Sequence, residues 1–154
     1  MPDDEYYMRL ALREAARAAE HHDVPVGAVV VLGGEVIGAG HNERELRQTP
    51  TAHAEMLAIE EAAQRIGHWR LLDTVLYVTV EPCPMCAGAI VQARIPRLVY
   101  GARDEKAGAA GTLFDLVRDP RLNHFVEVRS RVLEGDSIEL LQAFFRKRRE
   151  AGEK

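Results

Sequence analysis

The sequence predicts an α/β fold, a three-layer α/β/α sandwich around a mixed sheet of about five strands. Short β-branched segments alternate with helical segments along the chain, a pattern typical of a sheet covered by helices on both faces. The pair Gly33-Gly34 separates two apolar segments and predicts a β-hairpin, so part of the sheet is antiparallel. With 154 residues, 47% of them hydrophobic, the chain fits one domain over residues 1–154.

The amino-terminal half is expected to form a helix, the hairpin and a second helix. Residues 4–22 are rich in Ala, Leu, Arg and Glu and have one apolar face. Residues 26–32 and 35–40 flank the glycine turn as two strands, and the polar residues 42–51 are expected to form a loop. Residues 53–66 predict a helix that ends at Gly67, because glycine readily adopts the left-handed conformation that follows many helices.

The carboxy-terminal half is expected to alternate strands and helices. Residues 75–80, 97–101 and 125–129 predict strands, and residues 102–111 a flexible loop. A helix over residues 84–94 has proline near its first turn and another proline just after its end. A final helix covers residues 137–149. Strands separated by single helices should run parallel, through right-handed crossovers.

Composition and charge restrict the class of protein. No apolar run approaches the roughly 20 residues that cross a bilayer, and the acidic amino terminus lacks the order of a signal peptide. We therefore expect a cytoplasmic protein with no membrane partner. The net charge is -4, yet two phenylalanines precede four cations at residues 146–149. This cluster fits either RNA contact or a solvated helix end whose cations face the negative end of the helix dipole.

Two short motifs carry the chemistry: His-Ala-Glu at residues 53–55 and Pro-Cys-Pro-Met-Cys at residues 82–86. Each follows a strand and begins a helix, so both belong at the carboxyl edge of the sheet. His53, Cys83 and Cys86 are then expected to bind one zinc ion. A structural zinc normally has four protein ligands, whereas a catalytic zinc keeps one position for water. Three other histidines are possible fourth ligands: His41, His68 and His124.

Glu55 is the candidate catalytic residue. It lies two residues from His53 and projects in another direction, so it can face a water molecule without binding the metal. Zinc lowers the pKa of water to about 7, and the hydroxide attacks the carbon that bears an amine. Glu55 takes the water proton, gives it to the ring nitrogen, and then helps to protonate departing ammonia. This motif pair is typical of zinc nucleobase deaminases. In the competing interpretation, Glu55 only caps a helix beside a structural zinc.

The sequence also resembles the bacterial tRNA adenosine deaminases, which convert the wobble adenosine (position 34) of an anticodon to inosine. The resemblance runs from about Tyr7 to Arg149. The matching stretches are residues 24–29, 51–55, 76–83, 85–89, 100–104, 108–111 and 144–146, together with Asn42, Lys106, Asn123 and His124. Val80 stands where leucine is usual in the family, and no metal or proton-transfer position departs from the family pattern.

The resemblance implies a cytidine-deaminase-like fold, one Zn²⁺ per subunit and a homodimer. It also implies a tRNA anticodon stem-loop as partner, from an arginine tRNA with an ACG anticodon. Substrate contacts are implied for Asn42, Ala54, Asp104, Lys106, Asn123, Phe145, Arg146 and Arg149. Plainer roles compete: Asn42 as a cap at the hairpin exit, Asp104 and Lys106 as surface charges, and Asn123 as a turn residue.

Two other functions remain open. A deaminase of a free base or nucleoside, guanine or cytidine, would use the same zinc motifs. The basic, aromatic carboxy-terminal helix favours RNA instead. A zinc-stabilised RNA-binding module without catalysis is the second alternative, and the presence of Glu55 argues against it.

Overall fold

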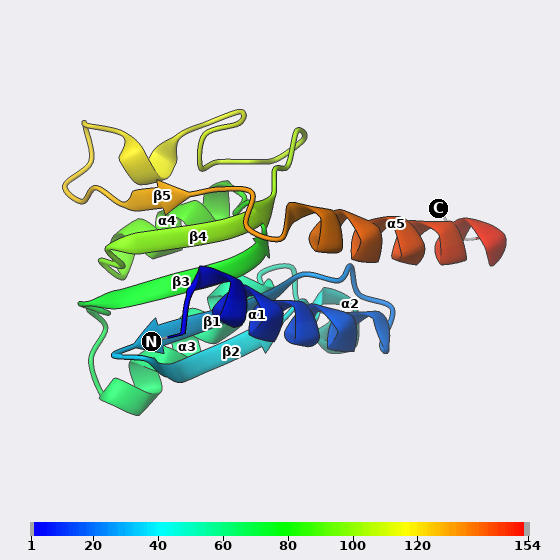
Figure 1. The fold of residues 1–154 in the computed structure, drawn as a ribbon, viewed down its shortest axis with the longest axis horizontal. Helices are drawn as coiled ribbons and strands as arrows, with labels where there is room; N and C mark the ends of the chain where they lie inside the picture. The colour runs from blue at the N-terminus through cyan, green and yellow to red at the C-terminus, as the bar shows by residue number, and fades with distance from the viewer. Residues whose placement is uncertain (1, 153–154) are drawn as a thin grey trace.

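A five-stranded sheet forms the middle layer of the computed structural model, which describes residues 2–152. The strand order is β2-β1-β3-β4-β5 (Figure 1). The strands are β1 (Gly27–Leu32), β2 (Glu35–His41), β3 (Thr74–Val80), β4 (Arg97–Ala102) and β5 (Glu127–Arg129). The helices are α1 (Asp4–Ala19), α2 (Arg44–Arg47), α3 (Ala54–Ile66), α4 (Pro84–Gln92), the 3-10 turn η1 (Leu116–Arg118) and α5 (Glu134–Glu150).

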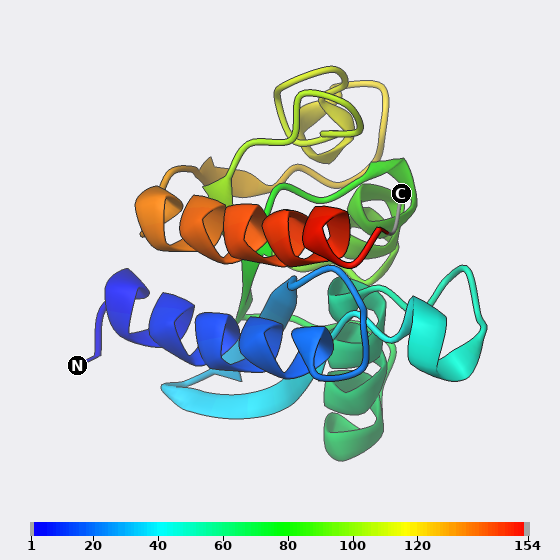
Figure 2. The ribbon, with the colours of Figure 1, turned by 90° about the vertical axis from the view of Figure 1, so that its right-hand side faces the viewer.

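Helices cover both faces of the sheet, as the sequence predicts. Helices α1 and α5 lie side by side on one face (Figure 2), and α3 and α4 pack on the other. Alternate residues of each strand pack against the two helix layers, because successive side chains of a strand point to opposite faces. Val30 and Leu76 pack on the α3–α4 side, whereas Val29 and Tyr77 pack on the α1 side.

Strand direction brings four strand ends to one edge. β1 pairs antiparallel with both β2 and β3, and β3, β4 and β5 pair parallel. β2, β3, β4 and β5 therefore all end at the same edge, opposite to that at which β1 ends. Two glycines let α3 lie close against β2: a Cβ at Gly38 would stand 2.2 Å from the carbonyl oxygen of Ala58, and one at Gly40 would stand 2.7 Å from that of Ala54. Glycine is needed where two backbones approach so closely.

Two helices end earlier than the sequence suggests. α1 stops at Ala19, three residues before the predicted end, because His22 adopts a φ of 68° and the Asp23 N–H bonds back to the carbonyl of Ala18. α4 stops at Gln92 and not at residue 94, because Arg94 adopts a φ of 62°. Positive φ is incompatible with a continuing right-handed helix.

Three other segments also differ from the prediction. The expected loop over residues 42–51 contains the short helix α2, whose backbone N–H groups at Glu45 and Leu46 donate to the carboxylate of Asp23. α5 begins at residue 134, directly after Leu133 in the left-handed conformation, and not at residue 137. The last strand is shorter than predicted and covers only residues 127–129.

The start of α1 is tied to the middle of the sheet by one carboxylate. Asp4 receives two hydrogen bonds of 2.8 Å from Arg97, one of 2.6 Å from Arg129 and one of 2.7 Å from the hydroxyl of Tyr77. These donors, Arg97 foremost, hold the pKa of Asp4 well below its ordinary value. Within residues 2–152, no helix combines the length and the apolar character needed to cross a bilayer.

Candidate metal centre and active site

Two helix starts bring the predicted metal ligands together. His53 is the residue before α3, Cys83 is the residue before α4, and Cys86 lies in the first turn of α4. Proline at the first position of α4 fixes where that helix begins. β2 leads into α3 through the short α2 segment, and β3 leads directly into α4. The order of elements therefore places all three side chains at the carboxyl edge of the sheet.

The spacing of the three side chains fits a tetrahedral zinc ion. Nδ1 of His53 lies 3.6 Å from Sγ of Cys83 and 3.5 Å from Sγ of Cys86. Zinc–sulfur and zinc–nitrogen bonds of about 2.3 and 2.05 Å at a tetrahedral angle require a separation of about 3.6 Å. Within residues 2–152, this is the one group of three or more His, Cys, Asp or Glu side chains with all ligand atoms within 4.8 Å.

The three histidines that the sequence offered as a possible fourth ligand are not part of this group. His41 contacts the carboxylates of Glu14 and Glu43, His68 accepts from the N–H of Arg70, and His124 lies 2.7 Å from the carbonyl of Ile95. Three protein ligands leave one position of a tetrahedral ion for water or substrate, which is the pattern of a catalytic zinc site.

The surroundings of Cys83 and Cys86 shift the pKa values of both thiols. The hydrogen bond from Cys86, together with His53, lowers the pKa of Cys83 to about 3, so its sulfur is a thiolate. The pKa of Cys86 is raised because its thiol donates to Cys83 and is buried. The hydrogen bond to Cys83 also raises the pKa of His53. Binding of a cation between the two sulfurs therefore releases protons.

Glu55 is buried beside the metal ligands. Its side chain is 4% exposed. Burial raises the pKa of Glu55 to about 7 because the charged form loses its hydration. At neutral pH the carboxyl group can both accept and donate a proton, which is the property of a group that shuttles protons.

Asn42 links the hairpin exit to the start of α3. Its amide nitrogen donates to the carbonyl of Val24 at 3.0 Å, and its amide oxygen accepts from the N–H of Ala54 at 3.0 Å. Both predicted roles fit this position, because the amide caps the helix next to His53 and keeps a second N–H for another acceptor. Ala54 is buried as the first residue of α3.

The loop after β4 carries two more of the predicted contact residues. Asp104 is half-buried, and its carboxylate accepts from the N–H groups of Lys106 and Ala107 at 3.0 and 3.1 Å. Lys106 is exposed, and so is Asn123, which lies between η1 and β5. The backbone of Ala109 donates to the carbonyl of Pro82 at 2.8 Å, so this loop touches the segment that holds the cysteines.

The predicted RNA-binding residues of α5 share one hollow. Phe145, Arg146 and Arg149 line a cavity of about 450 Å³ together with Arg103 from the end of β4. Phe144 instead packs inward and is 8% exposed. The carboxy-terminal half of α5 projects beyond the edge at which β3 and β4 end (Figure 1). The hollow and the metal centre therefore lie toward the same end of the molecule.

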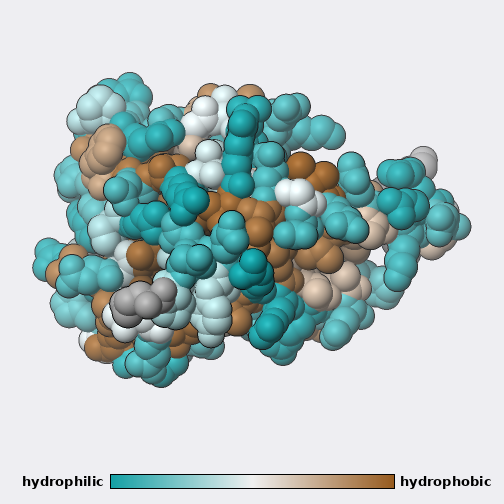
Figure 3. Space-filling model, in the orientation of Figure 1, coloured by the Kyte–Doolittle hydropathy of each residue, from teal (hydrophilic) through white to brown (hydrophobic). Residues whose placement is uncertain are grey.

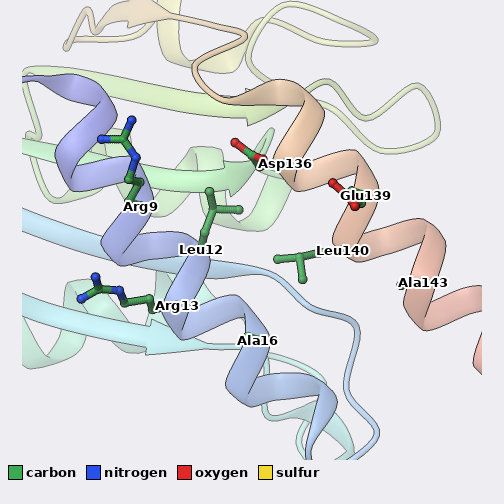
Figure 4. A pocket seen from close by; sticks show the side chains of 8 residues that line it. All are labelled: Arg9, Leu12, Arg13, Ala16, Asp136, Glu139, Leu140 and Ala143. Carbon is green, nitrogen blue, oxygen red and sulfur yellow. The ribbon is translucent and has the colours of Figure 1, made fainter.

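A larger groove, of about 610 Å³, lies between α1 and α5 (Figure 4). Leu12 and Leu140 point into it, with Arg9, Asp136 and Glu139 at its upper end (Figure 4). The space-filling view shows hydrophobic atoms between the two helices and mainly hydrophilic atoms toward the end of α5 (Figure 3). His53, Cys83 and Cys86 do not line this groove, so the candidate metal site is separate from it and lies at the starts of α3 and α4.

Two supporting residues were not identified from the sequence. Asp23 is 2% exposed; it caps α2 and contacts Nδ1 of His21 at 2.7 Å. Glu81 is 3% exposed, and its carboxylate accepts hydrogen bonds from backbone N–H groups of the loop after β4. The available signal for Glu81 was an acidic residue at the end of an apolar strand. Asp23 had no comparable signal, because acidic residues are common after a helix.

Known proteins resemble this chain over nearly its full length. A family model described as MafB19-like deaminase matches residues 2–149. A tRNA-specific adenosine deaminase of Bacillus subtilis is 52% identical over 149 residues, which is 97% of this chain and 92% of that protein.

Solved structures of deaminases also resemble this chain. One from a study of A-to-I editing by tRNA:A34 deaminases at the wobble position superposes with a TM-score of 0.85 and 45% identity, over 88% of this chain and 99% of that one. Guanine deaminase from Bacillus subtilis reaches a TM-score of 0.65 and 38% identity, over 72% of this chain and 71% of its own. The cytidine-deaminase-like fold is therefore confirmed. The chain belongs to the MafB19-like deaminase family, and is related over almost its whole length to the tRNA-specific adenosine deaminases.

Proposed function

We propose that this protein deaminates adenosine to inosine at the wobble position (34) of a tRNA. The observation that carries the proposal is a His-Cys-Cys group with tetrahedral zinc spacing beside a buried, protonatable Glu55. The RNA substrate is supported by the 52% identity to a tRNA-specific adenosine deaminase. The likeness to a structure from a study of wobble editing supports the same substrate.

His53, Cys83 and Cys86 are the proposed ligands of one Zn²⁺ per subunit. Zinc bound there would act as a Lewis acid and lower the pKa of water toward 7. Glu55 accepts the proton of the attacking water and donates it to the ring nitrogen of adenine. Glu55 then takes the remaining proton of the added hydroxyl group and gives it to the amine. The C–N bond breaks as the carbonyl of inosine forms, and the amine leaves as ammonia. Its pKa of about 7 suits both directions of transfer.

Substrate contacts are proposed around this centre. Asn42 offers its second amide N–H to the flipped nucleoside, and Ala54 supplies a small residue at the start of α3 where the base enters. Asp104, Lys106 and Asn123 contact the flanking nucleotides. A base that is chemically altered must leave the stacked strand, so several contacts outside the metal centre are needed to hold it.

The hollow on α5 is the proposed site for the anticodon loop. Phe145 is 39% exposed and can stack an unpaired base, while Arg146 and Arg149 hold phosphates. The partner is the anticodon stem-loop of an arginine tRNA with an ACG anticodon, and the enzyme acts in the cytoplasm. The aromatic ring of Phe145 and the guanidinium groups of Arg103, Arg146 and Arg149 around one cavity of about 450 Å³ support this proposal.

A homodimer is the proposed assembly. The family resemblance supports it, and so do four exposed large apolar side chains in the segment between the β4 loop and β5. These are Leu113, Phe114, Leu122 and Phe125, which are 53%, 54%, 43% and 65% exposed. Light scattering of the eluted protein tests the assembly: a mass near twice 17.2 kDa is expected, and the monomer mass would contradict it.

Deamination of a free base is the second candidate, because guanine deaminase of Bacillus subtilis is 38% identical to this chain. The two functions are distinguished by comparing substrates one at a time. The zinc-loaded protein receives the anticodon stem-loop, guanine, cytidine and adenosine in separate reactions, and ammonia release is measured. Release from the stem-loop alone supports the proposal, whereas release from guanine or cytidine alone would replace it. Binding of the stem-loop without any release would favour the non-catalytic RNA-binding module.

A further inference from the structure

The carboxylate of Glu81 lies at the centre of the loop that follows β4. Glu81 comes directly after β3, two residues before Cys83, and is 3% exposed. Oε1 accepts from the N–H of Asp104 at 3.1 Å and from the hydroxyl of Thr112. Oε2 accepts from the N–H of Ala110 at 3.0 Å and from that of Thr112 at 3.1 Å. One carboxylate thus holds both ends of the loop over residues 104–112.

Close packing fixes the middle of the same loop. A Cβ at Gly108 would lie 2.5 Å from Cδ of Glu81 and 2.5 Å from the carbonyl oxygen of Asp104, so a larger residue must displace one of them. The Ala109 N–H donates to the carbonyl of Pro82 at 2.8 Å. The loop is therefore bound to the two residues that immediately precede Cys83.

All four donors to Glu81 are neutral groups, three backbone N–H groups and one hydroxyl. A carboxylate satisfies them because both of its oxygens only accept hydrogen bonds. A glutamine has nearly the same shape but turns an NH₂ group toward one pair of donors. Those donors then lose their acceptor inside the protein, which is costly for buried polar groups. The loop is expected to shift until water reaches them.

We propose that Glu81 is a positioning residue for the substrate. It sets the loop over residues 104–112 against the cysteine segment, so that Asp104 and Lys106 meet the RNA at a fixed place beside the metal centre. The turn at Asp104, whose carboxylate accepts from the N–H of Lys106 at 3.0 Å, is part of the positioned unit. Glu81 itself touches neither metal nor substrate. The inference rests on the proposed function, because it assigns the loop to RNA binding.

The test is a steady-state comparison of Glu81→Gln with the wild-type, zinc-loaded protein on an anticodon stem-loop. KM for the RNA should rise about tenfold, equivalent to about 1.4 kcal/mol, while kcat changes by less than about threefold and zinc content stays at one per chain. Gly108→Ala should give the same pattern. Gly135→Ala is the matched control, because nothing lies within 4 Å of a Cβ at that position.

Three results would overturn the inference. The first is an unchanged KM in folded Glu81→Gln. The second is a loss of zinc and of kcat at unchanged KM, which would mean that Glu81 supports only the cysteine segment. The third is failure of the wild-type protein to convert the stem-loop. Of the three results, only this one would also overturn the proposed function.

If Glu81→Gln does not fold, Thr112→Val provides the same test, because it removes the hydroxyl that donates a hydrogen bond to Glu81. Its KM should rise, and Thr112→Ser should restore it. An unchanged KM in Thr112→Val would then count against the inference.

Discussion

Nδ1 of His53 lies 3.6 Å from Sγ of Cys83, a residue thirty positions later in the chain. The two atoms belong to the starts of two neighbouring helices, and their separation equals the about 3.6 Å that a shared tetrahedral zinc requires. The candidate metal centre is therefore preformed by the fold. Its geometry depends on where α3 and α4 begin, and less on the rest of either helix.

Removal of one thiol should remove the metal. Cys86→Ala is expected to lower zinc content from one per chain to near zero, because a His and a single thiolate hold zinc poorly. The midpoint of thermal unfolding should fall by several degrees, since metal binding contributes to folding free energy. Chelation should lower the midpoint of the wild type by a similar amount and leave the variant unaffected. A full zinc content in Cys86→Ala would contradict the ligand assignment.

Replacement of the proton shuttle should stop turnover without removing the metal. Glu55→Gln is expected to reduce kcat by about 10²–10⁴-fold, the usual contribution of a positioned acid–base group. Zinc content and the unfolding midpoint should stay close to the wild-type values, because Glu55 is not a ligand. Glu60→Gln, an exposed change on the same helix, is the matched control and should keep full activity. Zinc loss in Glu55→Gln would instead make Glu55 part of the metal site.

Asn42→Ala separates the capping role of Asn42 from its substrate role. The loss of its hydrogen bonds to Val24 and Ala54 should cost about 1 kcal/mol of unfolding free energy in either case. A substrate contact adds a loss of at least about tenfold in kcat/KM, measured where the variant is fully folded. Unchanged kcat/KM alongside reduced stability would show that Asn42 is only a cap.

The Asp4 cluster should make stability depend on pH. Because the folded pKa of Asp4 lies below its ordinary value of 3.8, its contribution is complete above about pH 4 and is lost as pH falls through the folded pKa. Asp4→Asn should therefore be about 1–3 kcal/mol less stable than wild type at pH 7, with a smaller difference at pH 3. Urea unfolding at both pH values measures this. A difference that does not shrink at pH 3 would contradict the ionic account.

RNA binding through α5 should depend on salt. In the inactive Glu55→Gln background, Arg149→Gln is expected to reduce the slope of log Kd against log salt by about 0.7, the value for one single-strand phosphate contact. Lys147→Gln is the control, because Lys147 lines a different cavity, on the α1 side of the helix. Equal slopes for Arg149→Gln and the background protein would exclude a phosphate contact at Arg149.

Local patterns were enough to predict the layers, the hairpin and the grouping of His53, Cys83 and Cys86. Gly33 and Gly34 adopt positive φ as the hairpin requires, and Gly67 ends α3 in the left-handed conformation. The metal group followed from short-range rules, because each motif sits at the start of a helix after a strand. These are features that neighbouring residues decide.

The features that the sequence did not predict depend on distant contacts. Helix α2 has four residues, too few for a periodic pattern, and forms where the carboxylate of Asp23 accepts its free N–H groups. Arg94 adopts a positive φ, and the sequence has no glycine or asparagine at that position to predict it. The loop over residues 102–111 looked flexible because of its glycines, yet Gly108 serves to bring the backbone against Glu81.

The most direct test of the central claim is inosine formation at one nucleotide. The zinc-loaded protein is incubated with an arginine tRNA transcript that carries an ACG anticodon, and the cDNA is sequenced for adenosine read as guanosine. We expect conversion at position 34 alone by the wild type and none above background by Glu55→Ala. An unconverted transcript, with ammonia released from free guanine or cytidine by the same preparation, would keep the zinc chemistry and contradict the RNA substrate.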